Sequence, residues 1–310
     1  MGILKIIYYF LITPGFLFTA VNGLISTWID RKITARLQWR RGPGFCQPFA
    51  DILKLLGKET FVPDDSKLIF VSAPLIALIA VTLVSTMLWI LNINSYVSFA
   101  GDLIVIILLL TIPSIALIMG GSVSKNPLST LGINREKKLL LSYELPFIIA
   151  ILTVAARASS ILTSEIISQQ AVAGMNISSF SGAIAFIVSL LVAQAQLGFV
   201  PFDIAEAEQE IEGGPLLEYS GSLLAVFKLT KVMLLFTLPV LLITLFMGGI
   251  DTYSLAGILW FLMKYVFILT LIILIKNTNP RIRIDQAVHF FLRPMTVFAI
   301  IGFILAIMGL

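Results

Sequence analysis

The sequence has almost none of the residues that hold redox centres. Its 310 residues include one cysteine, Cys46, and one histidine, His289. A single cysteine excludes an internal disulfide and the multi-cysteine ligand set of an iron–sulfur cluster, and a single histidine leaves no histidine-based haem or zinc site. No glycine-rich phosphate loop follows a strand. We therefore predict no catalytic residue and no metal site in this chain, so any redox carriers are expected in partner subunits.

Charge is also scarce. Only 12% of the residues are charged, whereas 58% are hydrophobic, and the mean hydropathy is +1.02. A soluble protein of this length carries about twice as much charge. The sequence therefore predicts an all-α integral membrane protein in which residues 1–310 form a single transmembrane domain. The first apolar segment is too long for a signal-peptide core and lacks a small-residue cleavage site, so we expect it to be a retained span.

Long apolar runs dominate the chain. A helix needs about 20 apolar residues to cross the hydrocarbon core. Eight stretches qualify, at about 3–28, 68–91, 102–123, 139–160, 181–200, 222–248, 255–276 and 294–310. Eight spans place both termini on one side and the odd-numbered connections on the other. Of the 21 basic residues, all but Lys5, Arg157 and Lys264 lie in or beside those odd-numbered connections, which predicts that they are cytoplasmic, with both termini outside the plasma membrane.

The first connection contains an amphipathic segment. It follows the turn Gly42-Pro43-Gly44 and extends from Gln47 to Lys58. On a helical wheel its apolar residues cluster on one side and its charged residues lie away from them. The apolar set is Phe49, Ile52, Leu53, Leu55 and Leu56, and the charged set is Asp51, Lys54 and Lys58. This pattern predicts a helix lying at the membrane interface, with an ordinary packed surface helix as the alternative.

The acidic residues concentrate between the fifth and sixth spans. Six of the chain's 17 acids fall within sixteen residues: Asp203, Glu206, Glu208, Glu210, Glu212 and Glu218. Pro201 suits a first helical position and Gly213-Gly214-Pro215 is a stop signal, so we predict a helix of about three turns between them. Like charges four residues apart destabilise a helix. The pattern therefore favours a carboxylate cluster kept for charge binding or proton handling over a solvated acidic loop.

A few ionisable residues fall inside the predicted spans. They are Glu144 in the fourth, Lys228 and Lys231 in the sixth, and Lys264 in the seventh. A charge near the bilayer centre costs at least about 2.5–3.5 kcal/mol, so it normally faces the bundle interior and finds a partner. We predict that Glu144 pairs with Lys228 or Lys231. Lys264 has the alternative of extending its stem toward the membrane surface.

Four stretches together resemble one family, the membrane subunit that anchors the redox arm in respiratory complex I, in membrane-bound NiFe hydrogenases and in formate hydrogenlyase. They are Arg40–Gly44 with Gln47–Leu55, Ser142–Glu144, Pro201–Glu210 with Glu218–Gly221, and Arg281–Gln286. The third stretch is the most specific, and the count of eight spans also fits. The short run Arg40–Gly44 is similar to the hydrogenase branch, because the complex I branch usually has a longer Gly-Pro-Asn-basic-Val-Gly run.

The resemblance implies an energy-coupling subunit of a respiratory oxidoreductase. In the hydrogenase branch, large and small subunits carry a NiFe centre and iron–sulfur clusters, and antiporter-like neighbours move protons or sodium; this chain would hold no cofactor itself. In the complex I branch the same membrane protein forms part of a quinone chamber. A sulfur-reducing relative shares the membrane architecture and stays an alternative. The rival from another class is a stand-alone cation transporter, although the chain contains no convincing internal repeat.

Two sets of residues follow from these arguments. The set expected to couple protons or ions is Glu144, Asp203, Glu206, Glu208, Glu210, Glu212, Glu218, Lys228, Lys231 and Lys264. The set expected to dock the peripheral arm is Arg36, Arg40, Arg41, Arg135, Tyr219, Arg281, Arg283 and Asp285. Crowded carboxylates cannot all ionise freely, so the pKa values of some are expected to rise toward neutrality.

Overall fold

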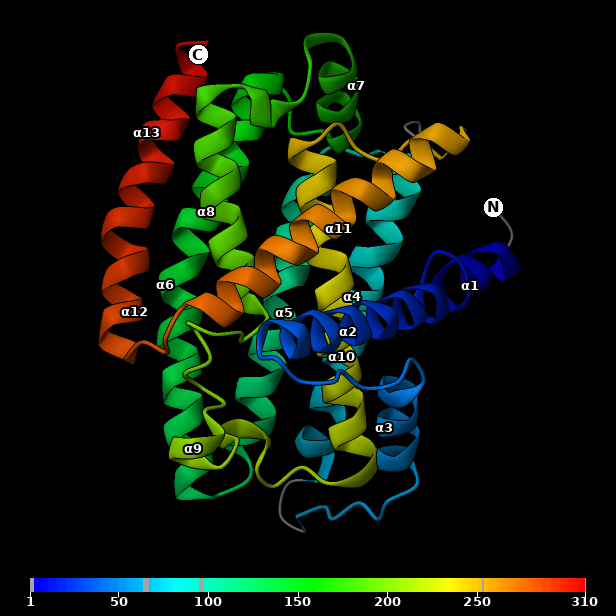
Figure 1. Ribbon diagram of the computed structural model, residues 1–310, viewed down its shortest axis with the longest axis vertical. Coiled ribbons are helices and arrows are strands. Elements are labelled where there is room, and N and C mark those ends of the chain that lie inside the picture. The colour runs from blue at the N-terminus through cyan, green and yellow to red at the C-terminus, as the bar shows by residue number, and fades with distance from the viewer. Residues whose placement is uncertain (1–2, 64–66, 95–97, 253, 310) are drawn as a thin grey trace.

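The computed structural model describes residues 3–63, 67–94, 98–252 and 254–309, and within these ranges every regular element is a helix (Figure 1). The helices are α1 (Ile3–Leu11), α2 (Phe16–Leu37), α3 (Gln47–Leu56), α4 (Lys67–Ile93), α5 (Asp102–Ser122), α6 (Pro127–Ala158), α7 (Thr163–Ala173), α8 (Phe180–Gln196), α9 (Glu208–Ile211), α10 (Gly221–Phe246), α11 (Leu255–Thr278), α12 (Ile284–Phe290) and α13 (Thr296–Ile307). Short turns η3 (Asn176–Ser178), η4 (Gly214–Leu216) and η5 (Phe291–Met295) complete them. The predicted all-α class is confirmed.

Seven helical segments in the described ranges are long and apolar enough to cross a membrane. They are Ile7–Leu37, Lys67–Ile93, Asp102–Ser122, Pro127–Ala158, Gly221–Phe246, Leu255–Thr278 and Ile284–Ile307. The remaining predicted span, at 181–200, corresponds to α8, which has 17 residues. At 1.5 Å per residue α8 is about 26 Å long, slightly less than the hydrocarbon core. The described part of the chain therefore contains seven segments long and apolar enough to span a membrane and one shorter apolar helix.

The first predicted span is divided in two. Residues 12–15 interrupt it between α1 and α2, and α2 continues to Leu37 instead of ending near residue 28. A Cβ atom on Gly15 would lie 1.8 Å from the carbonyl oxygen of Phe10, so only glycine fits where the chain turns. Because this contact arises from the path of the backbone, hydropathy alone does not predict it.

Two later helices also differ from their predicted ends. Helix α6 begins at Pro127, well before the predicted start at 139, and the side chain of Asn126 accepts a hydrogen bond from the amide of Leu128 as its cap. The last span begins at Ile284 because α12, η5 and α13 follow one another without a break. The wider π-helical turn of η5 accommodates Pro294 inside this segment.

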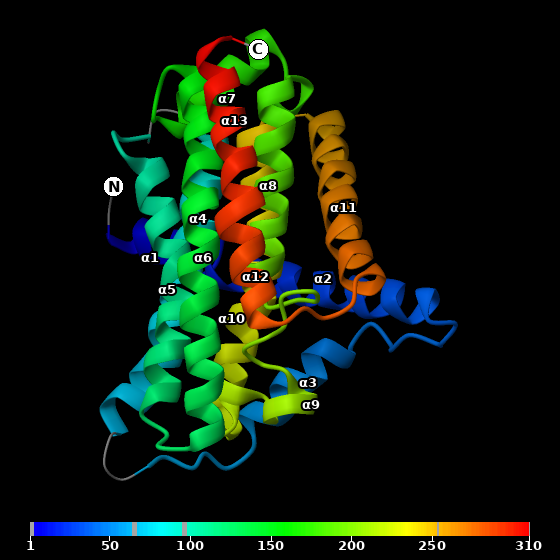
Figure 2. The ribbon, with the colours of Figure 1, turned by 90° about the vertical axis from the view of Figure 1, so that its left-hand side faces the viewer.

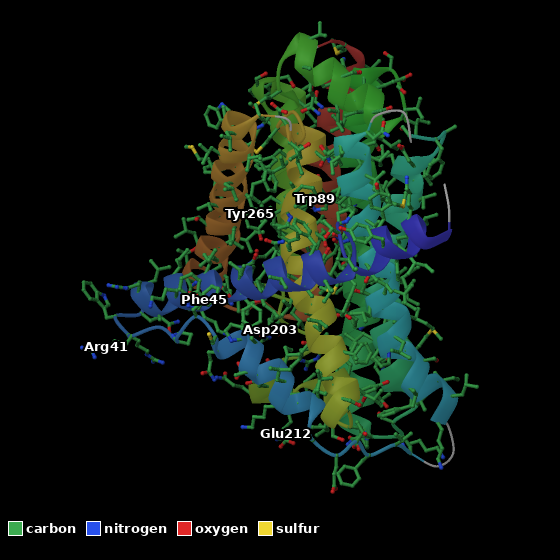
Figure 3. The ribbon with its side chains drawn as sticks, turned by 90° about the vertical axis from the view of Figure 1, so that its right-hand side faces the viewer. Arg41, Phe45, Trp89, Asp203, Glu212 and Tyr265 are labelled. Atoms are coloured by element: carbon green, nitrogen blue, oxygen red, sulfur yellow. The ribbon has the colours of Figure 1, made fainter. Side chains whose placement is uncertain are left out.

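Helix α10 is the centre of the bundle. Every residue from Met233 to Phe246 is buried, as expected for a helix that is apolar all round and surrounded by others. Helices α2, α3, α4, α8 and α11 pack against it. Helices α1 and α2 cross the bundle at a large angle to α4, α6 and α10 (Figures 1 and 3). This crossing brings α2 and α3 together against one side of α10.

The connections alternate between two ends of the bundle, as Figure 2 shows. Those after α2, α5, α8 and α11 meet at what we call the charged end: Asn126 contacts Glu218, Arg135 contacts Glu210, Arg281 contacts Asp203, and the amide of Phe61 donates to Ser220. Those after α4, α6 and α10 meet at what we call the neutral end, where Asn92 contacts Ile250, Asp102 contacts Thr163, and Gln170 contacts Gly248. The predicted alternation is confirmed; the side of the membrane on which each end lies stays a prediction.

Candidate functional site

The acidic stretch is mostly irregular, so the predicted three-turn helix is wrong. Helix α9 covers only Glu208–Ile211, and residues 201–207 form turns. Phe202 and Ile204 are buried, and Phe202 packs on Phe291 with ring centroids 4.7 Å apart. In a regular helix residues 202 and 204 would point in nearly opposite directions, whereas here both side chains lie in the core and Asp203 between them pairs with Arg281. The predicted stop after the stretch is confirmed by the positive φ of Gly213.

A small cavity with a largely apolar wall and a few ionisable side chains lies behind the acidic stretch, between α5, α6, α8 and α10. Its volume is about 40 Å³, and we call it the inner cavity. Its ionisable lining residues are Glu136, Asp203, Glu206 and Lys231. Lys231 and Glu206 form an ion pair, with side chains 31% and 19% exposed. Two more carboxylates therefore face a space that already contains one ion pair, which makes the charge of the cavity sensitive to protonation.

The inner cavity also contains an amide with no protein partner. Both the Nε2 and Oε1 atoms of Gln196, the last residue of α8, are buried without a hydrogen bond in the described part of the chain. A water molecule needs about 10–15 Å³ of such space and two to four polar neighbours. The cavity meets both conditions, with Gln196 beside Ser114, Glu136 and Thr230. The geometry therefore suits a hydrated path between the carboxylates.

Glu136 is a candidate functional residue that the sequence analysis missed. It sits within a run of charges, Arg135-Glu136-Lys137-Lys138, before the predicted fourth span, and so resembled an ordinary connection. In the structure it lies on α6, half-buried, and both Glu206 and Lys231 act on it electrostatically. Helical periodicity was the available signal, because buried Ile133, Leu140 and Tyr143 lie three, four and seven residues away, on the same side of the helix.

A second, wider pocket opens at the surface of the charged end. We call it the outer pocket; its volume is about 270 Å³, and its charged lining residues are Arg135, Asp203, Glu210, Arg281, Arg283 and Asp285. Arg281 pairs with Asp203 at 2.7 Å and Arg135 pairs with Glu210 at 2.6 Å. Burial raises the pKa of Asp203, while the guanidinium of Arg281 opposes the rise. Asp203 lines both the outer pocket and the inner cavity, so it connects the surface with the interior.

A third space lies on the other side of α10, between that helix, α2 and α3. We call it the basic groove; its volume is about 390 Å³, and its charged lining residues are Arg31, Asp51, Lys54, Lys58, Lys228 and Lys231. Arg31 donates to Asp51 at 2.6 Å, and this hydrogen bond holds the pKa of the Asp51 carboxyl below its usual value. Lys231 lines both the basic groove and the inner cavity.

The predicted partner of Glu144 is wrong. Lys231 pairs with Glu206, and Lys228 faces the basic groove. Glu144 is half-buried on α6, two turns beyond Glu136, and forms no ion pair with a base in the described ranges. In the sequence, Glu144 and the two lysines lie at similar depths in their spans. The sequence does not show which face of α6 meets which face of α10, so it could not identify the ion pair.

Lys264 lies apart from the carboxylates. Its ammonium donates to the carbonyl of Met247 at 2.5 Å, at the C-terminal end of α10 and the neutral end of the bundle. A cation there satisfies a helix-terminal carbonyl and suits the helix dipole. The structure therefore gives Lys264 a capping contact and does not bring it to the other predicted coupling residues.

The remaining predicted residues divide into exposed and buried ones. Glu208, Glu210, Glu212 and Glu218 are exposed, and of these only Glu210 lines the outer pocket. Arg36, Arg40 and Arg41 are exposed at the end of α2, where Arg41 points away from the bundle (Figure 3). Tyr219 differs from its predicted docking role, because it is only 3% exposed. Its ring stacks on Phe70 at 4.0 Å, its hydroxyl donates to the Phe70 carbonyl, and burial raises its pKa. Tyr219 therefore anchors the loop internally.

A buried ion pair that the sequence analysis also missed closes the charged end. Asp30, near the end of α2, accepts from Lys276, near the end of α11, at 2.7 Å, and the Asp30 side chain is 7% exposed. The same ammonium lies 4.3 Å from the ring centroid of Phe199. Within the described ranges no group of three or more His, Cys, Asp or Glu residues could hold a metal ion.

Together these features define an all-helical, multi-span membrane protein in which a cavity containing ionisable groups is connected to a charged surface at one end. Residues 10–307 match the NADH dehydrogenase family, and the chain therefore belongs to that family. Among curated relatives, the H-type subunit of the NADH-quinone oxidoreductase of Dehalococcoides mccartyi is 32% identical over 94% of this chain and 84% of its own length. The corresponding protein of Bacillus mycoides is 32% identical over 87% and 85%.

A solved structure matches nearly the whole fold. It is a chain of the membrane-bound sulfane sulfur reductase, described as an archaeal respiratory membrane complex. The match has a TM-score of 0.88 and 31% sequence identity, and covers 98% of this chain and 100% of the other. The protein is thus a multi-pass membrane subunit of the kind that works in multisubunit respiratory complexes.

Proposed function

We propose that this chain docks a peripheral redox arm on its charged end and couples electron transfer there to proton or sodium translocation. The observation that carries the proposal is the position of Asp203, which pairs with Arg281 in the outer pocket and also lines the inner cavity. A charge that appears on a docked partner acts first on the groups at this surface. The same carboxylate then transmits the change inward, because it is shared by both spaces.

The electrostatics support a relay in this order. Arg281 holds the pKa of Asp203 down against burial, so a partner that draws Arg281 away favours protonation of Asp203. Loss of that negative charge weakens the repulsion between Asp203 and Glu206. The weaker repulsion then changes the strength of the ion pair between Glu206 and Lys231. Glu136 completes the path on α6, and Glu144 is the next carboxylate along that helix.

We further propose that the complex belongs to the branch that does not use quinone, with a NiFe hydrogenase as first choice. The short Arg40–Gly44 run supports this branch. A sulfur-reducing complex is the second candidate, and the end-to-end match with a sulfane sulfur reductase chain favours it. In either case iron–sulfur clusters would reside in partner subunits, with a NiFe centre in the hydrogenase case, and antiporter-like subunits would adjoin this chain in the membrane.

Purification of the intact complex from its native membrane tests this proposal. We expect the chain to co-purify with proteins containing iron and labile sulfide, and the reduced complex to evolve hydrogen, with nickel present in stoichiometric amount. Sulfide production without nickel would identify the second candidate. Quinone reduction blocked by quinone-site inhibitors would contradict the branch assignment, and purification of the chain alone as an active cation transporter would contradict the coupling proposal itself.

A further inference from the structure

The basic groove contains positive charge that no carboxylate among the described residues neutralises. Five basic side chains line it and only one acid, Asp51, which pairs with Arg31. Lys231 is occupied by Glu206. The ammonium groups of Lys54, Lys58 and Lys228 form no ion pair with a carboxylate in the described ranges, yet all three converge on one space of about 390 Å³. All three side chains are exposed to solvent, and together they give the groove an excess of positive charge that an anionic ligand would complement.

The walls of the same groove are apolar. Leu24 from α2, Ile52 and Leu55 from α3, and Val232 from α10 line it beside the lysines. A small soluble anion would gain nothing from these side chains. A ligand that fits both parts has an anionic head and a hydrocarbon chain.

The groove lies at the level where such a ligand is abundant. Helix α3 has the predicted amphipathic character, and its outer side exposes Leu53 (68%) and Leu56 (49%). Trp28 and Phe45 pack edge to face beside it, 5.3 Å apart, and Phe45 is itself half exposed. Exposed leucines on an interfacial helix together with tryptophan and phenylalanine mark the boundary between hydrocarbon and headgroups. In Figure 3, α3 runs below α2, and both lie against α10.

We propose that the basic groove is a binding site for one anionic phospholipid. Its phosphate would lie among Lys54, Lys58 and Lys228, and an acyl chain would cover Leu24, Ile52 and Leu55. Clusters of lysine at a membrane surface bind anionic headgroups by this chemistry. The site is separate from the proposed relay, apart from Lys231, which both spaces share.

The test compares lipids on the unaltered intact complex. The complex is exchanged into nanodiscs of phosphatidylcholine containing a minor fraction of either phosphatidylglycerol or phosphatidylethanolamine, and the lipid retained after detergent extraction is counted by native mass spectrometry. We expect one phosphatidylglycerol per complex to resist extraction, at least about tenfold better than either zwitterionic lipid. Equal retention of all lipids would overturn the proposal. Release of phosphatidylglycerol by millimolar inorganic phosphate would identify a soluble-anion site instead and would also overturn it.

A matched pair of variants assigns the lipid to this groove. The test variant is Lys54→Gln, Lys58→Gln and Lys228→Gln combined, with Lys231 unchanged. The control is Lys5→Gln, Lys137→Gln and Lys138→Gln combined, three exposed lysines outside the groove. We expect only the test variant to lose phosphatidylglycerol, by about tenfold. Equal retention in both variants would refute the assignment. Because the lipid comparison uses unaltered protein, it decides the proposal even if the test variant assembles poorly.

Discussion

The two ends of this bundle solve the same problem with different chemistry. At each end, connections from distant parts of the sequence must be tied together. The neutral end does this with uncharged hydrogen bonds: Gln170 bonds the Thr244 carbonyl and the Gly248 amide, Asn176 bonds the Leu245 carbonyl, and Asn92 bonds Thr244 and the Ile250 amide. A fully buried acid at this end, Asp102, accepts from the amide and hydroxyl of Thr163.

The charged end uses ion pairs for the same task. Among the described residues, five ion pairs join its elements. Amide hydrogen bonds have one state over the physiological pH range, whereas carboxylate and ammonium groups respond to a nearby charge or proton. The charged end also contains the inner cavity, the outer pocket and the basic groove. A membrane bundle can close its connections largely with uncharged groups, as the neutral end does, so the charges at the other end serve something besides closure.

The largest effect on stability is expected at the buried pair of the charged end. Asp30→Ala leaves the Lys276 ammonium partly buried beside Phe199 without its carboxylate, which should lower the free energy of unfolding by about 3 kcal/mol. Urea unfolding of the detergent-solubilised protein, followed by tryptophan fluorescence, measures this change. The double variant Asp30→Ala with Lys276→Met should recover most of the loss. Equal loss in the single and double variants would show that the pair contributes packing and not charge.

The second prediction contrasts one lysine from each end. Lys231→Met strands Glu206 in the inner cavity, and we expect ion translocation into sealed vesicles to fall about tenfold or more while redox activity of the peripheral arm persists. Lys264→Met removes a lysine of the neutral end. It should leave translocation unchanged and cost only about 1 kcal/mol of stability, because one hydrogen bond to the Met247 carbonyl is lost. Equal losses of translocation in the two variants would contradict the proposal that the charged end, and not the neutral end, takes part in coupling.

The third prediction concerns pH. Burial raises the pKa of Asp203, so the folded protein retains that proton at higher pH than an unfolded chain does, and the carboxylate becomes destabilising as pH rises through the raised pKa. Arg281→Gln removes the opposing charge, which should raise this pKa further and shift the acid limb of the coupled rate to higher pH. Asp203→Asn should abolish the shift. An unchanged profile for Arg281→Gln would separate the outer pocket from the coupled reaction.

The smallest effect is expected at the pair that holds α3. Arg31 and Asp51 have side chains 41% and 37% exposed, so Asp51→Asn should cost at most about 1 kcal/mol. The pKa of Asp51 is lowered, so its stabilising contribution is present above the usual aspartate pKa and is lost as pH falls through the lowered value. Thermal midpoints at pH 7 and pH 3 measure it. A difference between variant and parent that is larger at pH 3 would contradict this assignment.

Sequence reasoning predicted the features that depend on composition and long periodicity. The membrane class, the alternating connections and the amphipathic α3 follow from apolar run lengths and charge placement, which the bilayer enforces directly. The sequence did not predict the break at Gly15. Glycine is required there because a Cβ atom would collide with the Phe10 carbonyl, and this contact exists only in the folded chain. Nor did the sequence predict the irregular path of residues 201–207, where burial of Phe202 and Ile204 overrides the local helix signals.

The candidate site was predicted as a region but not as a set of contacts. Asp203, Glu206 and Lys231 were identified from their residue types, yet the pairing of Lys231 with Glu206 in place of Glu144 depends on which faces of two helices meet. Glu136 was missed because neighbouring charges on α6 resembled a solvated connection. Both errors concern the direction in which one face of a helix points. That direction is set by contacts between helices that are distant in the sequence.

The most direct test of the central claim is the ratio of ions translocated to electrons transferred when Glu136 is neutralised. Glu136→Gln keeps the size and hydrogen bonding of the side chain in the inner cavity but removes its titratable charge. Glu165→Gln, an exposed acid on α7 at the neutral end, is the matched control. Assembly, redox activity and translocation are measured on the same vesicle preparation. The relay predicts intact redox activity with translocation reduced about tenfold or more for Glu136→Gln alone; an unchanged ratio in both variants would contradict it.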